Sequence, residues 1–64
     1  MIKINGRAVQ ADELKLSDAL AELGFEAKKI AVEVNEIIIP KAQYSSCILH
    51  SGDVVEVVSF VGGG

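Results

Sequence analysis

Alternating apolar and polar positions open the chain and predict a strand. Ile2 and Ile4 alternate with lysine and asparagine, which is the two-residue period of a half-buried strand. The Asn5-Gly6 pair that follows is a favoured two-residue hairpin turn, because both positions tolerate positive φ. Residues 7–10 are short and polar, and they predict a returning strand at the edge of a sheet.

The same period returns in the second half of the chain. Residues 30–34 alternate and predict a third strand, and Asn35-Glu36 predicts a turn after it. Residues 37–39 predict a short fourth strand that ends at Pro40, because proline has no N–H to donate to a ladder. Residues 54–61 predict the last strand.

One segment has the period of a helix instead. Leu16, Ala19, Leu20 and Leu23 lie at i, i+3, i+4 and i+7 and form one apolar face. Gly24 is well placed to end this helix in the left-handed conformation. Residues 41–49 lack a clear period and predict an irregular crossover with one helical turn.

These elements predict an α+β fold in the order ββαβββ. One helix would cover one face of a mixed sheet of four to five strands, so that each amphipathic element buries its apolar side. We expect a single domain over residues 1–64, with a flexible glycine tail at 62–64.

The last strand divides its side chains between two faces. Val55 and Val57 are expected to face the helix, which leaves Glu56, Val58 and Phe60 on the uncovered side. Exposed apolar residues just before the chain end are a candidate docking surface for a partner protein.

Composition narrows the class of function. The 64 residues carry a formal net charge of −3, which argues against nucleic acid as a ligand. The apolar runs are far shorter than the roughly 20 residues of a membrane span. Met1 leads straight into a strand pattern without a signal-peptide pattern, and the single cysteine cannot form an internal disulfide. We therefore expect a cytoplasmic protein.

The chain ends in Gly62-Gly63-Gly64, directly after an apolar run. Glycine loses the most conformational freedom on ordering and has no side chain to pack, so folding does not explain three of them in a row. Such a tail suits a terminal carboxylate that reacts inside a partner's narrow cleft. The remaining polar candidates have simpler explanations: Cys47 as a small packing residue, His50 as a lone histidine, and Asp53 as a turn residue.

Taken together, these segments resemble the ThiS family, the sulfur carrier proteins of thiamin biosynthesis. The resemblance covers the whole chain, and the segments that carry it are the Asn5-Gly6 hairpin, the helix with Gly24, residues 31–36, Ile39-Pro40, Ser51-Gly52-Asp53 and residues 60–64. It implies the β-grasp, ubiquitin-like fold, which agrees with the order ββαβββ.

The resemblance also implies a function. A ThiF-type adenylyltransferase would use ATP to adenylate the carboxylate of Gly64, and a sulfur donor such as a cysteine desulfurase would convert the adenylate to a thiocarboxylate. Thiazole synthase, ThiG, would receive the sulfur. Gly62 and Gly63 would thread into the partners' active sites, and Val58, Phe60 and Val61 would dock. The chain would be a carrier and not an enzyme, with no bound cofactor, catalytic residue or metal.

Three other functions remain open. The small subunit of molybdopterin synthase shares the fold and the diglycine end, although such carriers are usually longer. A ubiquitin-like modifier would join its carboxylate to lysines. An interaction module would have an inert tail, and one fold hosts many functions.

Overall fold

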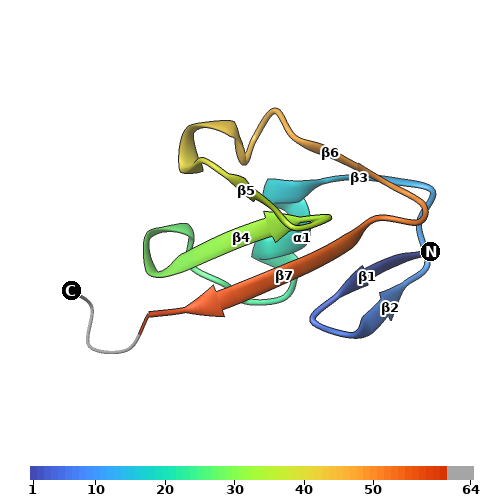
Figure 1. The fold of residues 1–64 in the computed structure, drawn as a ribbon, viewed down its shortest axis with the longest axis horizontal. Helices are drawn as coiled ribbons and strands as arrows, with labels where there is room; N and C mark the ends of the chain where they lie inside the picture. The colour runs from blue at the N-terminus through green and yellow to red at the C-terminus, as the bar shows by residue number, and fades with distance from the viewer. Residues whose placement is uncertain (61–64) are drawn as a thin grey trace.

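A mixed sheet backed by one helix organises the described part of the chain (Figure 1). The structure is a computed structural model and describes residues 1–60. Its strands are β1 (Ile2–Ile4), β2 (Arg7–Val9), β3 (Glu13–Lys15), β4 (Ile30–Val34), β5 (Ile37–Ile39), β6 (Ile48–His50) and β7 (Val54–Ser59). The helix is α1 (Leu16–Glu22), and short 3-10 turns lie at Ala27–Lys29 and Lys41–Gln43.

The main sheet has five strands in the order β2-β1-β7-β4-β5. The last strand, β7, therefore lies at the centre, although it comes from the end of the described chain. It runs parallel to β1 and antiparallel to β4. Every other pairing in this sheet is an antiparallel hairpin. The predicted α+β class, with one helix on a mixed sheet, is confirmed.

The hairpin turns at Asn5-Gly6 and Asn35-Glu36 both have positive φ angles. The sequence predicted positive φ for the first of these turns. Asn5 and Gly6 have φ of 51° and 80°, which matches the favoured two-residue hairpin turn. Asn35 and Glu36 have φ of 51° and 69°. Glutamate has a Cβ and adopts this left-handed conformation at a free-energy cost, so the second turn is strained.

The helix lies where the apolar period placed it. It begins at Leu16 and buries Leu16, Ala19 and Leu20. The preceding Lys15 makes no side-chain capping hydrogen bond. Gly24 has a φ of 83° and ends the helical segment, as predicted.

The sequence prediction missed one pair of strands. Residues 41–49 were expected to be an irregular crossover, yet their end forms β6, which pairs antiparallel with β3 in a separate two-stranded sheet. The pairing brings Leu14 opposite Leu49. A three-residue strand with one inward side chain is too short to show a two-residue alternation in the sequence. Such strands are recognised only from their pairing with a distant segment. The last strand also ends at Ser59, before the predicted residue 61.

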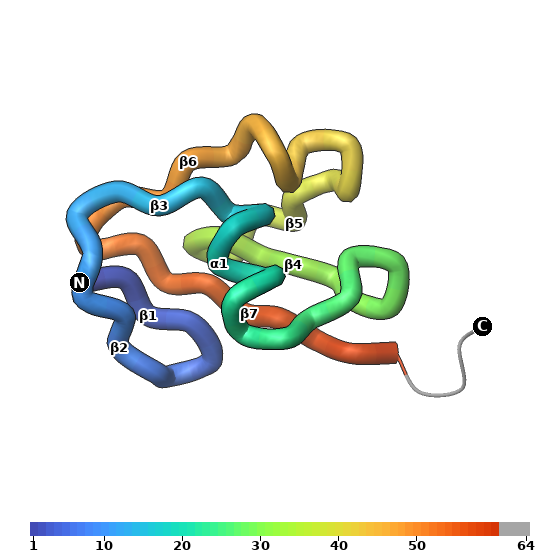
Figure 2. The backbone as a smooth tube through the Cα atoms, turned by 180° about the vertical axis from the view of Figure 1, so that it is seen from behind, coloured from blue at the N-terminus to red at the C-terminus, as the bar shows by residue number. Residues whose placement is uncertain are grey.

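The helix α1 lies against one face of the sheet, as the view from behind shows (Figure 2), and the buried core lies between the two. It is aliphatic apart from one tyrosine, and its buried members are Ile2, Ile4, Leu16, Ala19, Leu20, Ile30, Val32, Tyr44, Leu49, Val55 and Val57. The opposite side of the five-stranded sheet has no helix over it in the described residues. We call this side the open face. From the alternation and register, its side chains are Lys3, Ala8, Ala31, Glu33, Ile38, Val54, Glu56, Val58 and Phe60.

Candidate functional site: the open face and the base of the glycine tail

The central strand sends its side chains alternately to the core and to the open face. Val55 and Val57 are buried, at 0% and 7% exposure, and pack under the helix. Val58 and Phe60 are 57% and 51% exposed. The predicted division of the last strand between two faces is therefore correct. Two large apolar side chains are left accessible at the end of this strand.

The backbone at the base of the tail is fixed to a neighbouring segment. The N–H of Phe60 donates to the carbonyl oxygen of Lys29 at 2.7 Å. An open hollow of about 360 Å³ lies here, lined by Gly24, Phe25, Glu26, Lys29, Ile30, Ser59 and Phe60. The chain thus leaves the sheet at a defined point beside an accessible surface.

Four of the predicted site residues follow the described part of the chain. Val61, Gly62, Gly63 and Gly64 lie outside the described residues. What the structure does locate is the point from which they continue, one residue after β7.

Two asparagine side chains hold β7 from either side. Asn5 donates from Nδ2 to the carbonyl oxygen of Val57 at 3.1 Å and accepts the N–H of Val57 at 2.8 Å. Asn35 accepts the N–H of Val54 at 3.0 Å. Each asparagine also occupies a hairpin turn at positive φ. The turn sequences predicted these hairpins, but nothing local predicted that their side chains would grip the central strand.

Asp53 completes the start of that strand. Its Oδ2 accepts the N–H of His50 at 2.8 Å, and its Oδ1 accepts the Nδ2 of Asn35 at 3.0 Å. These hydrogen bonds, the backbone one first, hold the pKa of Asp53 below its usual value. The predicted role of Asp53 as a turn residue is confirmed.

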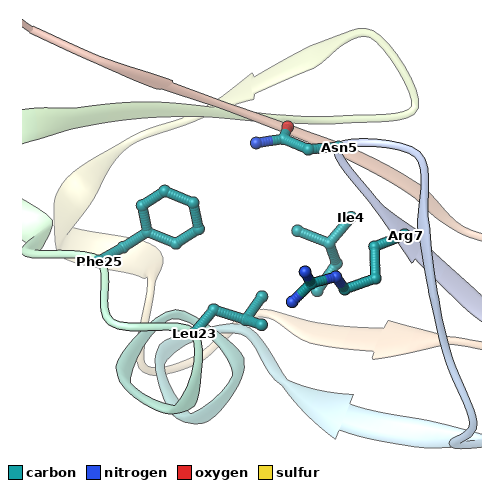
Figure 3. Close-up of a pocket in the computed structure, with 5 residues that line it drawn as sticks. All are labelled: Ile4, Asn5, Arg7, Leu23 and Phe25. Atoms are coloured by element: carbon teal, nitrogen blue, oxygen red, sulfur yellow. The ribbon is translucent and has the colours of Figure 1, made fainter.

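A second hollow opens on the helix side, between the β1–β2 hairpin and the end of α1 (Figure 3). It measures about 260 Å³ and is lined by Ile4, Asn5, Arg7, Leu23 and Phe25. The guanidinium of Arg7 lies near Leu23, with the ring of Phe25 across the hollow. One cation beside an amide and three apolar side chains brings together no acid and base for catalysis.

The lone cysteine and histidine lie apart from the tail base. Cys47 is half-buried and packs against the core. Burial first, and the charge of Asp53 second, raise the pKa of the Cys47 thiol, which keeps it in its less reactive form. His50 is exposed and lies 3.9 Å from a carboxylate oxygen of Glu13. These placements support structural roles for both residues.

The described residues hold neither a group of metal ligands nor a membrane-spanning helix. Within residues 1–60, no three His, Cys, Asp or Glu side chains are grouped so that they could hold a metal ion. Over the same residues, no helix has the length and apolar character needed to cross a membrane.

Comparison with known proteins decides the family. The model of the ThiS family matches residues 2–64. The chain belongs to the ThiS family. It is 41% identical over 66 residues to the sulfur carrier protein ThiS of Bacillus subtilis, and the match covers 100% of both chains. The crystal structure of the thiamine biosynthesis protein ThiS from Geobacter metallireducens superposes with a TM-score of 0.79 at 28% identity, over 98% of this chain and 97% of that one.

A relative of another kind carries a similar segment within a longer chain. The thiazole synthase of Paramagnetospirillum magneticum is 47% identical over 45 residues, which is 70% of this chain. This chain spans only 14% of the length of that relative.

These comparisons confirm several predictions at the level of the family. The chain is a ThiS sulfur carrier of thiamine biosynthesis, with the β-grasp fold that the resemblance implied. The match over the full length of a protein named as a sulfur carrier supports the prediction of a carrier rather than an enzyme. The roles of individual residues and the identity of the partners belong to the proposal that follows.

Proposed function

We propose that the carboxylate of Gly64 is the sulfur-carrying group. The observation that carries this proposal is the position of β7, the central strand of the sheet. This strand ends at Ser59, and the sequence continues through Phe60 and Val61 to the three glycines. The match to the Bacillus subtilis carrier supports it, because that match spans both chains from end to end. Three extended residues reach about 10 Å, which suffices to enter a partner's active site while the sheet stays outside.

The chemistry requires activation by another protein. A carboxylate is a poor electrophile, so an oxygen of Gly64 first attacks the α-phosphorus of ATP, and pyrophosphate leaves. Sulfide or the terminal sulfur of a persulfide then attacks the carbonyl carbon, and AMP leaves. With a persulfide donor, a thiolate must afterwards cleave the S–S bond to free the thiocarboxylate. Gly62 and Gly63, which lack a Cβ, leave the carbonyl open to both attacks.

The proposed partners follow from these steps. A ThiF-type adenylyltransferase uses the ATP, so this chain itself holds no cofactor, and a cysteine desulfurase supplies the persulfide. Thiazole synthase receives the sulfur. A thiazole synthase relative with a similar segment in its own chain supports this last assignment. We propose the cytoplasm as the location, since the free Cys47 suits a reducing compartment.

The open face beside the tail would dock on these partners. Val58 and Phe60 are exposed next to the tail base, and Val61 continues from them. We expect Phe60→Asp to weaken binding to the activating enzyme at least about tenfold with little change in melting temperature. Ile37→Asp is the matched control, because Ile37 is 66% exposed but lies on the edge strand β5. Equal affinities for the two variants would exclude a docking role for Phe60.

Intact-mass measurement tests the proposal directly. The full chain is incubated with ATP, a ThiF-type enzyme and sulfide. A mass gain equal to the exchange of one oxygen for sulfur, located at Gly64 by fragmentation, is the expected result. The chain lacking Gly63 and Gly64 should fold equally well and gain nothing. No gain in the full chain, with an enzyme shown to be active on another carrier, would refute the proposal. Lysine conjugates in the cell would instead indicate a protein modifier.

A further inference from the structure

The open face holds two carboxylates directly opposite each other. Glu33 on β4 and Glu56 on β7 are register partners in the antiparallel pair. Their neighbours Val32, Val34, Val55 and Val57 point to the helix side, so both glutamates point to the open face. Side chains opposite each other on one face have Cβ atoms only about 5 Å apart. Glu33 is half-buried there and Glu56 is exposed.

No ion pair of the described residues includes Glu33 or Glu56. Within residues 1–60, the close contacts between basic and acidic side chains join Lys29 to Glu26 and His50 to Glu13, and neither involves Glu33 or Glu56. Lys3 is the only basic member of the open face, and its register partner is Val54 rather than either glutamate. Like charges directly opposite each other destabilise a sheet, so the isolated protein keeps an unfavourable pair at its centre.

The pair lies within a continuous surface that leads to the tail. An open hollow of about 530 Å³ is lined by Glu33, Asn35, Glu36, Val54 and Glu56. Next to it, Val58 lies opposite Ala31, and Phe60 follows at the base of the tail. Along β7 the open face therefore passes from an acidic hollow to an apolar strip and then to the glycine end.

We propose that Glu33 and Glu56 are the charged contact of the open face with thiazole synthase, and that arginine or lysine side chains of that enzyme sit between them. The inference rests on the proposed function, which has the open face dock on its partners, and adds the two residues that set the charge of the contact. A basic side chain between the two carboxylates would turn a repulsion into two attractions. Because the acidic hollow and Phe60 lie along the same strand and its end, docking there brings the base of the tail up to the enzyme. An apolar patch of the enzyme would cover Val58 and Phe60.

We assign thiazole synthase as the partner of this surface because a relative of that name carries a similar segment within its own chain. In that relative the two segments share one chain and therefore meet at a high effective concentration, so a modest, charge-dependent interface is enough for them to bind each other. An electrostatic contact also forms quickly and releases easily, which suits a carrier that must leave after delivery.

The test compares two double variants of equal charge change. E33Q/E56Q removes the opposed pair, whereas E13Q/E22Q removes two carboxylates from β3 and α1, outside the five-stranded sheet. Binding of each full chain to purified thiazole synthase is measured by calorimetry over a range of salt concentrations. Melting temperatures of the free chains are measured in parallel.

We expect E33Q/E56Q to bind about tenfold more weakly at low salt and to lose most of the salt dependence, with the control within about twofold of the wild type. The melting temperature of E33Q/E56Q should rise by about 2–5 °C, since a repulsion is removed. Weaker binding by a more stable chain cannot come from misfolding.

Three results would overturn the inference, the last of them from the same calorimetry repeated with the activating enzyme. Equal weakening in both double variants would show a general effect of net charge, and unchanged binding in E33Q/E56Q would show that the pair faces no cation. If only binding to the activating enzyme weakened, thiazole synthase would be the wrong occupant. The proposed function is judged separately, by the sulfur gained at Gly64 of the wild type, so either idea can fail alone.

Discussion

The side chain of Asn5 makes the two hydrogen bonds to the backbone of Val57 that a neighbouring strand would otherwise make. Its side-chain amide donates to the carbonyl oxygen of Val57 and accepts the N–H of Val57, at 3.1 and 2.8 Å. The parallel pairing of β1 with β7 reaches Ile4 and Val55. The backbone N–H of Asn5 still donates to the carbonyl oxygen of Val55 at 2.9 Å. After that bond the backbone turns away into its hairpin, and the side-chain amide of Asn5 continues the ladder. The central strand thus stays paired toward the tail although its neighbour has ended.

Replacing Asn5 tests the strength of this contact. Asn5→Gly keeps a residue that adopts the φ of 51° but removes both hydrogen bonds. We expect the free energy of unfolding to fall by about 1–2 kcal/mol, measured by urea denaturation. Asn5→Asp retains an acceptor for the N–H of Val57 but loses the donor, so it should fall in between. Wild-type stability in Asn5→Gly would contradict this reading.

Glu36 offers a substitution that should stabilise the protein. Its φ of 69° is left-handed, which costs a residue with a Cβ about 1–2 kcal/mol. Glu36→Gly removes that strain, and part of the gain is offset by the greater freedom of glycine in the unfolded chain. The expected net gain is about 0.5–1 kcal/mol. Glu36→Gln controls for the lost charge and should leave the strain in place, so a similar gain in both would point to electrostatics instead.

Asp53 should make stability depend on pH in the acid range. Its pKa is lowered in the folded protein from the ordinary value of 3.8, so its contribution is present above that value and is lost as the pH falls through the folded pKa. Asp53→Asn should therefore lower the free energy of unfolding by about 1 kcal/mol at pH 7. The difference from the wild type should shrink below pH 3.8. Thermal unfolding at several pH values checks this, and a gap that stayed constant would rule out the ionised form as the cause.

Cys47 should be dispensable for sulfur transfer. Burial raises the pKa of its thiol, so little thiolate is present at pH 7. We expect Cys47→Ala to acquire sulfur at the wild-type rate in the intact-mass assay and to lose about 1 kcal/mol of stability from packing. The folded wild type should react slowly with a disulfide reagent, and the same chain in denaturant should react as a free cysteine. Loss of sulfur transfer in Cys47→Ala would assign the thiol a chemical role.

The sequence predicted the elements whose signal is local. Two-residue alternation located the strands at Ile2–Ile4 and Ile30–Val34, and the three-to-four-residue period located the helix. Asn5-Gly6 predicted its hairpin because the turn selects residues by backbone conformation. Alternation in the last strand also predicted which side chains would stay exposed, since a core face implies the opposite one.

What was missed depends on contacts between distant residues. Leu14 and Leu49 become strand residues only by pairing with each other, and their short segments have no period of their own. The grip of Asn5 on Val57 spans 52 positions, so no window of sequence contains both partners. The opposition of Glu33 and Glu56 likewise depends on the register between β4 and β7, which three-dimensional pairing alone fixes.

Because β7 is the central strand, recognition of the chain end by a partner depends on the sheet being fully folded. A ribosome makes β7 after all other strands of this sheet, yet β1 and β4 both need it as their shared neighbour. Until it emerges, the two hairpins have nothing to join them. An incompletely synthesised or unfolded chain would therefore offer neither the assembled open face nor a tail in its proper place. An activating enzyme that recognises this surface would therefore act only on folded, full-length carriers and would not use ATP on defective ones.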